Sequence, residues 1–169
     1  MAAHDEGCRR VAAHYRVDVA EAADVTIVCS GGFPKDINFI QAHKSLHHAS
    51  YATRAGGEII FVAECREGMG NEDLLSWFDL AEGAAFRDAL LNSYQMNAHT
   101  ALAMREKATR FRIHMVSMLA DDVVTRLGMI PHRTLQEAVS AIAEAAGEEQ
   151  EVLVIKNGSL LVPHLSGEA

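Results

Sequence analysis

The chain has 169 residues, of which 49% are hydrophobic and 22% are charged. These fractions are those of ordinary globular proteins, and they exclude a disordered, collagenous or membrane-embedded chain. The formal net charge of −8 repels phosphate backbones, and no segment gathers a basic stripe, so we expect no nucleic-acid partner. The length favours a single domain around one core.

The cysteines and the hydropathy of the chain indicate the cellular compartment in which the protein is expected. Cys8, Cys29 and Cys65 lie far apart and form no CxxC pair, so we interpret them as reduced thiols. No apolar run reaches the roughly 20 residues that cross a bilayer, and the start MAAHDEGCRR is too polar for a secretory signal. We therefore expect a cytoplasmic protein without a membrane partner.

The predicted elements alternate along the chain. Residues 1–19 carry a helical stretch and an extended YRVDV piece, which we interpret as a connector from another domain. Short apolar runs that end in turn residues predict strands. They lie at 25–32, 58–65, 112–119 and 151–158, with a further pairing segment at 160–163. Helical patterns fall at 36–53, 71–92, 97–110, 121–127 and 134–146.

This alternation predicts the fold class. We expect a three-layer α/β domain spanning residues 1–169, with a mainly parallel sheet of about four or five strands and helices on both faces, Rossmann-like or flavodoxin-like. The best-marked helix begins at Thr134, where Thr134 and Glu137 form a capping-box pattern. Folds of this class place ligands at the carboxyl ends of the strands.

Two loops are predicted at that edge of the sheet. The first strand ends in Gly31 and Gly32, ahead of Asp36 and a helix. This resembles an anion-binding turn, although GxGxxG and GK[ST] are both absent. The second strand leads to Glu64 and Arg66. The alternative interpretation of the first loop is a tight turn that needs its glycines, and that of the second is an ion-paired loop without a ligand.

The helix that follows the first turn carries the main candidate residues. In INFIQAHKSLHH, Gln41 and Lys44 are neighbours at i and i+3. Helical side chains lean toward the amino end, so both tilt toward the carboxyl rim of the sheet. An ammonium and an amide suit a carboxylate with a neighbouring hydroxyl. The alternative is that both are solvated surface residues.

Several histidines are weaker candidates. His43 and His47 have the i, i+4 spacing of HExxH zinc enzymes, but Lys44 takes the place of the glutamate. We therefore expect no metal bound by this chain. His99, at the start of the third long helix, is predicted to face the crevice, with packing or capping as the alternative. No GxSxG elbow is present, which argues against a hydrolase.

The segments GGFPKDINFIQAHKSL and GGEIIFVAECREGMGNE resemble the C-terminal domain of the nickel-pincer-nucleotide-dependent lactate racemase family, and the similarity runs from AHDEGCRRV to VLVIKNGSLLVP. The resemblance implies a two-domain cytoplasmic enzyme that racemises or epimerises 2-hydroxy acids by moving a hydride onto and off the cofactor. In that family the cofactor, the metal ligand and the acid/base histidines belong to the N-terminal domain. This chain would then lack that domain, hold no catalytic residue and be inactive alone.

The resemblance also assigns substrate contacts. It gives Gln41 and Lys44 contacts to the substrate, and it places His99 approximately where relatives carry a crevice-facing aromatic residue or histidine. Ile40 stands where relatives that act on lactate often carry tyrosine, which favours a larger or more apolar 2-hydroxy acid. The alternative function is a free-standing α/β module that binds a small anion or has a regulatory role.

Overall fold

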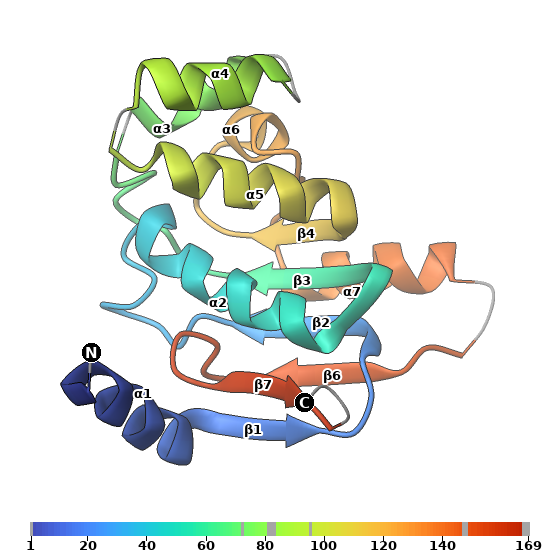
Figure 1. Cartoon of the computed structure of the whole chain (residues 1–169). Helices are drawn as coiled ribbons and strands as arrows, with labels where there is room; N and C mark the ends of the chain where they lie inside the picture. The colour runs from blue at the N-terminus through green and yellow to red at the C-terminus, as the bar shows by residue number, and fades with distance from the viewer. Residues whose placement is uncertain (1, 72, 81–83, 95, 147–148, 167–169) are drawn as a thin grey trace.

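The computed structural model describes residues 2–71, 73–80, 84–94, 96–146 and 149–166. Its centre is a sheet of five strands in the order β5-β4-β3-β2-β6, and every neighbouring pair is parallel (Figure 1). The strands are β2 (Ala23–Cys29), β3 (Thr53–Val62), β4 (Arg112–Val116), β5 (Ile130–His132) and β6 (Val152–Ile155). The prediction of a parallel α/β sheet is confirmed.

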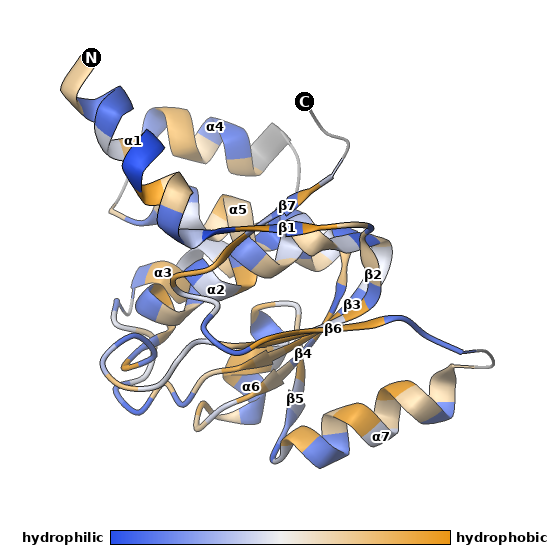
Figure 2. Ribbon diagram, turned by 90° about the horizontal axis from the view of Figure 1, so that it is seen from below, coloured by the Kyte–Doolittle hydropathy of each residue, from blue (hydrophilic) through white to orange (hydrophobic). Residues whose placement is uncertain are grey.

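Helices cover both faces of this sheet. α2 (Phe39–Ala52) and α5 (Ala98–Arg110) lie on one face, and α7 (Leu135–Ala145) lies on the other, as Figure 2 shows from below. α6 (Asp121–Arg126) contacts β5. The strands are apolar because helices cover them from both sides.

The two faces bury unequal cores. The main cluster lies between the sheet and the α2–α5 layer and includes Leu46, Phe61 and Met104, each fully buried. The cluster beneath α7 is small, and it consists of Val25, Ile60, Ala138 and Ile142 with partly buried neighbours. The α2–α5 layer therefore supplies most of the hydrophobic stabilisation.

The prediction of one continuous helix at 71–92 is wrong. The chain forms α3 (Asp73–Ser76), a 3-10 turn η1 (Trp77–Asp79) and α4 (Ala84–Asn92). Arg105 of α5 explains part of the break, because its Nη2 donates to the carbonyl oxygens of Phe78 and Leu80 at 2.6 Å each. These carbonyls bind a guanidinium from another helix, whereas a continuous helix would point them along its own axis.

The connector predicted at the N-terminus pairs with the last strand in a second, small sheet, and that strand also contacts α2. α1 (Ala2–Tyr15) leads into β1 (Arg16–Val19), which pairs in parallel with β7 (Val162–Leu165) in a two-stranded sheet. A groove of about 620 Å³ lies between α1 and β7. Within the described ranges, no helix is long and apolar enough to span a membrane.

The sequence did not predict β5 as a strand. It has three residues, Ile130–His132, one of which is proline. A segment this short shows no periodicity, and proline is confined to edge strands, which is where β5 lies in the sheet.

Candidate functional site

The turn from β2 to α2 requires its two glycines. Gly31 and Gly32 have φ of 98° and 74°, a region that side chains with a Cβ rarely adopt. A Cβ on Gly31 would also lie 3.0 Å from Oδ1 of Asn157. α2 then begins at Phe39, after the N-cap residue Asn38, whose side chain accepts a hydrogen bond from the backbone N of Gln41 at 3.0 Å. The turn thus places the first residues of α2 at the carboxyl edge of the sheet.

Asp36 joins the two predicted loops. Its Oδ2 accepts from the backbone N of Glu64 at 3.2 Å, and its carbonyl oxygen accepts from the N of Cys65 at 2.9 Å. The residue is 7% exposed, and its Oδ1 has no hydrogen-bond partner among the described residues. Asp36 therefore holds the ends of β2 and β3 together, beneath the crevice rim.

Glu64 and Arg66 form an ion pair at 2.7 Å, and the guanidinium lies 5.3 Å from the ring centroid of Phe33. The structure brings these two candidates together, in the ion-paired arrangement that was the alternative reading. Between them, burial raises the pKa of the Cys65 thiol to about 12. This thiol is therefore not a nucleophile at neutral pH.

Gln41 and Lys44 lie together on the exposed side of α2. The Nζ of Lys44 donates to Oε1 of Gln41 at 2.7 Å, so the lysine leans toward the amino end of the helix, as predicted. Among the described residues, the side-chain N–H groups of Gln41 and the remaining N–H groups of Lys44 have no other hydrogen-bond partner. Ile40 is half-buried and packs against the main core.

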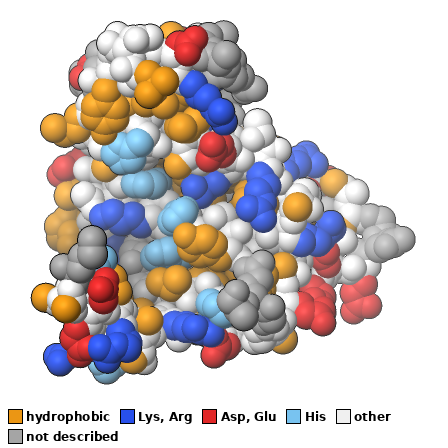
Figure 3. Space-filling model, in the orientation of Figure 1, with side chains coloured by type: hydrophobic (Ala, Val, Ile, Leu, Met, Phe, Trp, Pro, Cys, Tyr) orange, Lys and Arg blue, Asp and Glu red, His pale blue; other side chains and the backbone are white. Residues whose placement is uncertain are grey.

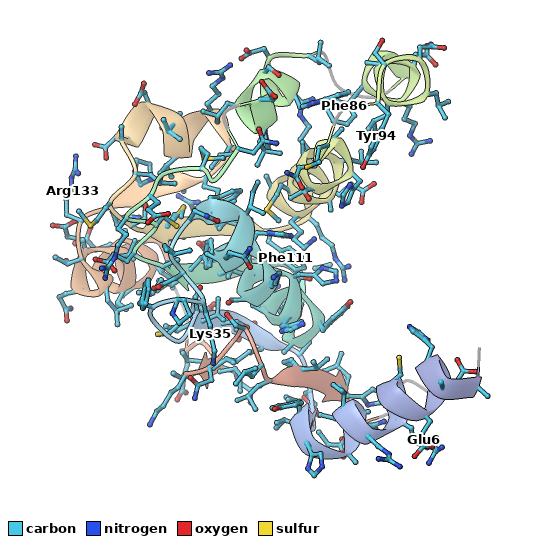
Figure 4. All side chains as sticks on the ribbon, turned by 90° about the vertical axis from the view of Figure 1, so that its left-hand side faces the viewer. Glu6, Lys35, Phe86, Tyr94, Phe111 and Arg133 are labelled. Atoms are coloured by element: carbon cyan, nitrogen blue, oxygen red, sulfur yellow. The ribbon has the colours of Figure 1, made fainter. Side chains whose placement is uncertain are left out.

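His99 is exposed at the start of α5. Its Nδ1 lies 3.0 Å from the hydroxyl of Tyr94, and the two rings are nearly parallel, with centroids 6.4 Å apart. Figure 4, which views the edge where the sheet strands end, shows Tyr94 between α4 and α5. The sequence analysis missed Tyr94, although it lies five residues before a candidate histidine.

The histidines of α2 have separate partners. Nδ1 of His43 lies 2.5 Å from the carbonyl oxygen of Ile40, and Nε2 of His47 lies 2.8 Å from the hydroxyl of Tyr51. Burial lowers the pKa of both histidines. In the described part of the chain, no group of three or more His, Cys, Asp or Glu side chains could hold a metal ion. These residues do not fit a nickel centre, so we derive no step through that metal from them.

His48 has a structural partner. Its Nδ1 lies 2.6 Å from the carbonyl oxygen of Gly158, whose N donates to the carbonyl oxygen of Cys29 at 2.8 Å. A Cβ on Gly158 would lie 2.9 Å from Cβ of Ser45. The turn after β6 thus packs directly on α2, and glycine is required there.

Lys107 on α5 was missed from sequence. It is 8% exposed, and its Nζ donates to the carbonyl oxygen of Ala103 at 3.1 Å. Burial lowers the pKa of its ammonium group. Lys107 lies on the buried side of α5 with Thr100 and Met104, and this i, i+4 and i+7 spacing was the available signal.

Two cavities formed by described residues lie away from Gln41 and Lys44. One of about 300 Å³ lies beneath α7 and is lined mainly by aliphatic side chains, including Ile60 and Ile142. The groove of about 620 Å³ lies between α1 and β7. Gln41 and Lys44 are exposed on α2, and neither lines these two cavities.

Comparison with known proteins identifies relatives for most of the chain. Residues 18–162 match the family of the lactate racemase C-terminal domain. The lactate racemase of Lactiplantibacillus plantarum is 31% identical over 163 residues, which cover 93% of this chain and 38% of that protein. The lactate racemase of Thermoanaerobacterium thermosaccharolyticum is 30% identical over 164 residues, which cover 92% of this chain and 38% of that protein.

Solved structures agree with the sequence relatives. The lactate racemase apoprotein of T. thermosaccharolyticum superposes with a TM-score of 0.83 at 25% identity, over 95% of this chain and 40% of that one. A protein from Thermotoga maritima superposes with a TM-score of 0.64 at 11% identity, over 98% of this chain and 42% of that one, and this likeness shows the fold alone.

The chain spans less than half the length of these relatives. The family match covers the five-stranded sheet with α2, α5 and α7 and leaves α1 outside. The resemblance that the residues of α2 suggested is thereby confirmed, and the chain belongs to the lactate racemase C-terminal domain family.

Proposed function

We propose that the chain is the substrate-contacting C-terminal domain of a 2-hydroxy acid racemase or epimerase. The observation that carries this proposal is the Lys44–Gln41 pair, which is joined at 2.7 Å on the exposed side of α2 in a chain that matches lactate racemases. The proposed role of the pair is to bind the substrate carboxylate and hydroxyl and to orient the carbon that reacts. Lys44 supplies charge, and Gln41 supplies a donor and an acceptor.

We propose that the hydride-accepting cofactor, a nickel-pincer nucleotide, belongs to an N-terminal domain. When bound, such a cofactor would take the hydride from the substrate and return it to either face. This chain would orient the substrate and help to exclude water.

The surface around α1, β1 and β7 supports contact with that other domain. α1 has no buried residue, and Val11 and Val17 are 53% and 43% exposed. A two-stranded sheet is marginally stable by itself. The groove between α1 and β7 is lined by apolar residues such as Val11, Tyr15 and Val162, together with His4, Arg16 and His164. We propose that the N-terminal domain covers this unit.

The test is a chimaera in which this chain replaces the matching part of the L. plantarum lactate racemase. We expect the chimaera to interconvert the enantiomers of a 2-hydroxy acid. Lys44→Ala in the chimaera removes a charged contact to the carboxylate, and a loss of roughly 100-fold in kcat/KM is expected. Lys156→Ala, which changes an exposed lysine in the turn after β6, serves as the matched control.

Full activity of the Lys44→Ala chimaera would refute the role assigned to α2. The free-standing binding module is not favoured by the comparisons, because the similarity covers only part of much longer racemases. Calorimetry on the 169-residue chain separates the two functions. Tight binding of lactate to the chain alone, together with an inactive chimaera, would support the module.

A further inference from the structure

The backbone N–H groups at the start of α2 already have acceptors within the chain. Such groups lack partners inside their own helix, and in many proteins they bind anions. Here the N of Phe39 donates to the carbonyl oxygen of Gly68 at 3.0 Å. The N of Ile40 donates to the carbonyl oxygen of Met69 at 3.3 Å. A neighbouring loop, and not a ligand, therefore satisfies the first two groups.

The next two N–H groups of α2 are used by the N-cap. The N of Gln41 donates to Oδ1 of Asn38, and the N of Ala42 donates to the carbonyl oxygen of Asn38, both at 3.0 Å. Figure 3 shows His, Lys and Arg side chains gathered on the side of the molecule where α2 and α5 lie. Positive charge on that side attracts an anion. The first turn of α2 therefore offers an anion the side chain of Gln41, with that of Lys44 one turn on, and not its backbone.

The acceptors for Phe39 and Ile40 belong to the 64–70 loop, which follows β3. The loop is tightly folded, because the N of Gly68 donates to the carbonyl oxygen of Cys65 at 2.9 Å, and Cys65 has a φ of 52°. A residue with a side chain keeps such a φ only where the surrounding structure holds it. The loop thus has a fixed shape where it contacts the start of α2.

Asp36 joins this loop to the segment that precedes α2. Its Oδ2 accepts from the N of Glu64 at 3.2 Å, and its carbonyl oxygen accepts from the N of Cys65 at 2.9 Å. The carbonyl oxygen of Ile37 accepts from the N of Glu67 at 2.9 Å. Asp36 is 7% exposed, so water competes little for its hydrogen bonds. The carboxylate of Asp36 is the side chain that holds the 64–70 loop in place.

The second half of α2 is held from another side. The Oγ atoms of Ser45 and Ser159 lie 3.0 Å apart, and Nδ1 of His48 lies 2.6 Å from the carbonyl oxygen of Gly158. These contacts reach the turn after β6 and not the 64–70 loop. Loosening the loop would therefore disturb the first turn of α2, while the second half of the helix keeps its anchor.

We propose that Asp36 is a positioning residue that acts on the substrate through Gln41. The carboxylate orders the 64–70 loop, and the loop holds the two N–H groups that directly precede Gln41. The side-chain amide of Gln41 is thereby kept in one place at the rim of the sheet. The assignment rests on the proposed function, in which this amide contacts the carboxylate or hydroxyl of a 2-hydroxy acid. Asp36 lies beneath the rim and does not itself touch the substrate.

The first experiment measures amide hydrogen exchange by NMR in the 169-residue chain, relative to the amides of the central sheet. Asp36→Ala is expected to accelerate exchange at Phe39 and Ile40 by at least about tenfold, because their acceptors loosen. Asp36→Asn keeps an acceptor oxygen for the N of Glu64, and it should restore slow exchange. Ile142→Ala, on the α7 face, is the destabilised control and should leave the relative rates unchanged.

The second experiment is a double-mutant cycle in the chimaera with the L. plantarum lactate racemase. Asp36→Ala is expected to lower kcat/KM by roughly tenfold and to raise KM, because the amide that contacts the substrate is misplaced. In the Gln41→Ala background the same change should have almost no effect, because the group through which Asp36 acts is gone. A merely structural role would give equal losses in both backgrounds.

Three results would overturn the proposal. They are unchanged exchange at Phe39 and Ile40 in a folded Asp36→Ala variant, equal losses in the two backgrounds of the cycle, and an Asp36→Asn variant that behaves like Asp36→Ala. If Asp36→Ala does not fold, Gly70→Ala decides by the same criteria, because a Cβ there would lie 2.5 Å from Cγ of Asn38 and displace the loop.

Failure of the proposed function gives a different result. A parent chimaera without activity would refute the racemase assignment, and with it the role of Asp36 toward a substrate. Accelerated exchange at Phe39 and Ile40 in Asp36→Ala would still establish that Asp36 holds the start of α2. The two measurements therefore separate an error about the loop from an error about the reaction.

Discussion

The two faces of the central sheet differ in packing and in chemistry. On the α2–α5 face, the core beneath the helices includes the fully buried Leu46 and Phe61, and the outer sides of the helices carry Lys44, His47 and His99. On the α7 face, one helix covers part of the sheet above a cavity of about 300 Å³, and Val152 and Val154 of β6 are more than half exposed. The face with the candidate site is also the better packed, so its helices can hold polar groups in fixed positions.

The α7 face also buries a polar network. Nε2 of His114 lies 2.6 Å from Oε2 of Glu58, and Nδ1 of His114 lies 2.8 Å from Nε2 of His132. His114 is 2% exposed and pairs in register with Ile60 of the α7 core. A neutral His114 with its proton on Nε2 would donate to Glu58 and accept from His132. This network links β3, β4 and β5 through side chains, whereas the other face uses apolar packing.

The largest expected effect is the loss of stability when a core side chain is truncated, which should differ between the two faces because they differ in packing. Leu46→Ala leaves a cavity in the closed core, and we expect the free energy of unfolding to fall by about 3–5 kcal/mol. Ile142→Ala acts beside an existing cavity, and a loss nearer about 2 kcal/mol is expected. Urea unfolding of both variants measures the difference. A larger loss for Ile142→Ala would reverse the comparison.

The second effect is a pH dependence that originates on the α7 face. Burial lowers the pKa of His114 below its ordinary value of 6.5, in spite of Glu58. Below 6.5 the unfolded chain therefore binds a proton that the folded chain does not. We expect the contribution of His114 to the free energy of unfolding to be complete above pH 6.5. As the pH falls from 6.5 through the pKa of His114 in the folded chain, the contribution should decline by at most about 1.4 kcal/mol per pH unit.

The test is to measure the free energy of unfolding of the wild-type chain and of His114→Gln from pH 7.5 to lower values, and to compare how steeply it falls with pH in the two proteins. His43 and His47 have pKa shifts in the same direction, so the variant is expected to keep a shallower slope. An identical slope in both proteins would show that His114 does not carry the effect.

The smallest effect compares the helix caps of the two faces. Asn38 accepts from the N of Gln41 at 3.0 Å, and Thr134 accepts from the N of Glu137 at 3.1 Å. Each substitution by alanine is expected to lower the free energy of unfolding by about 1 kcal/mol. Asn38→Ala is also expected to weaken 2-hydroxy acid binding by the chimaera, since the cap holds the backbone of Gln41. Thr134→Ala serves as the stability-matched control, and equal affinity in the two variants would contradict this prediction.

Local patterns accounted for the elements that local interactions determine. The Thr134–Glu137 capping pattern is confirmed at the start of α7, where Glu137 also accepts from the N of Arg133 at 2.8 Å. The i, i+3 spacing likewise predicted that Gln41 and Lys44 are neighbours, and a hydrogen bond joins them in the structure. Both features depend only on helical geometry, which neighbouring residues encode. Their roles toward a ligand stay predictions.

Other features depended on residues far along the chain. The break within 71–92 involves Arg105, which lies 25 and 27 residues from the carbonyls it binds. The pairing of β1 with β7 joins the two ends of the chain. Neither interaction leaves a periodic signal in the sequence, because each depends on which elements the fold brings together.

By itself, the sequence determined that strands and helices alternate, that the sheet is parallel, and that an amide and an ammonium group share one side of a helix. Hydrophobic periodicity and capping chemistry act over a few residues, and the sequence shows them directly. Only the tertiary structure decided that Lys107 is buried and that α2 and α5 pack their apolar sides into one core. That arrangement follows from strand order and crossover packing, in which residues about 60 positions apart become neighbours.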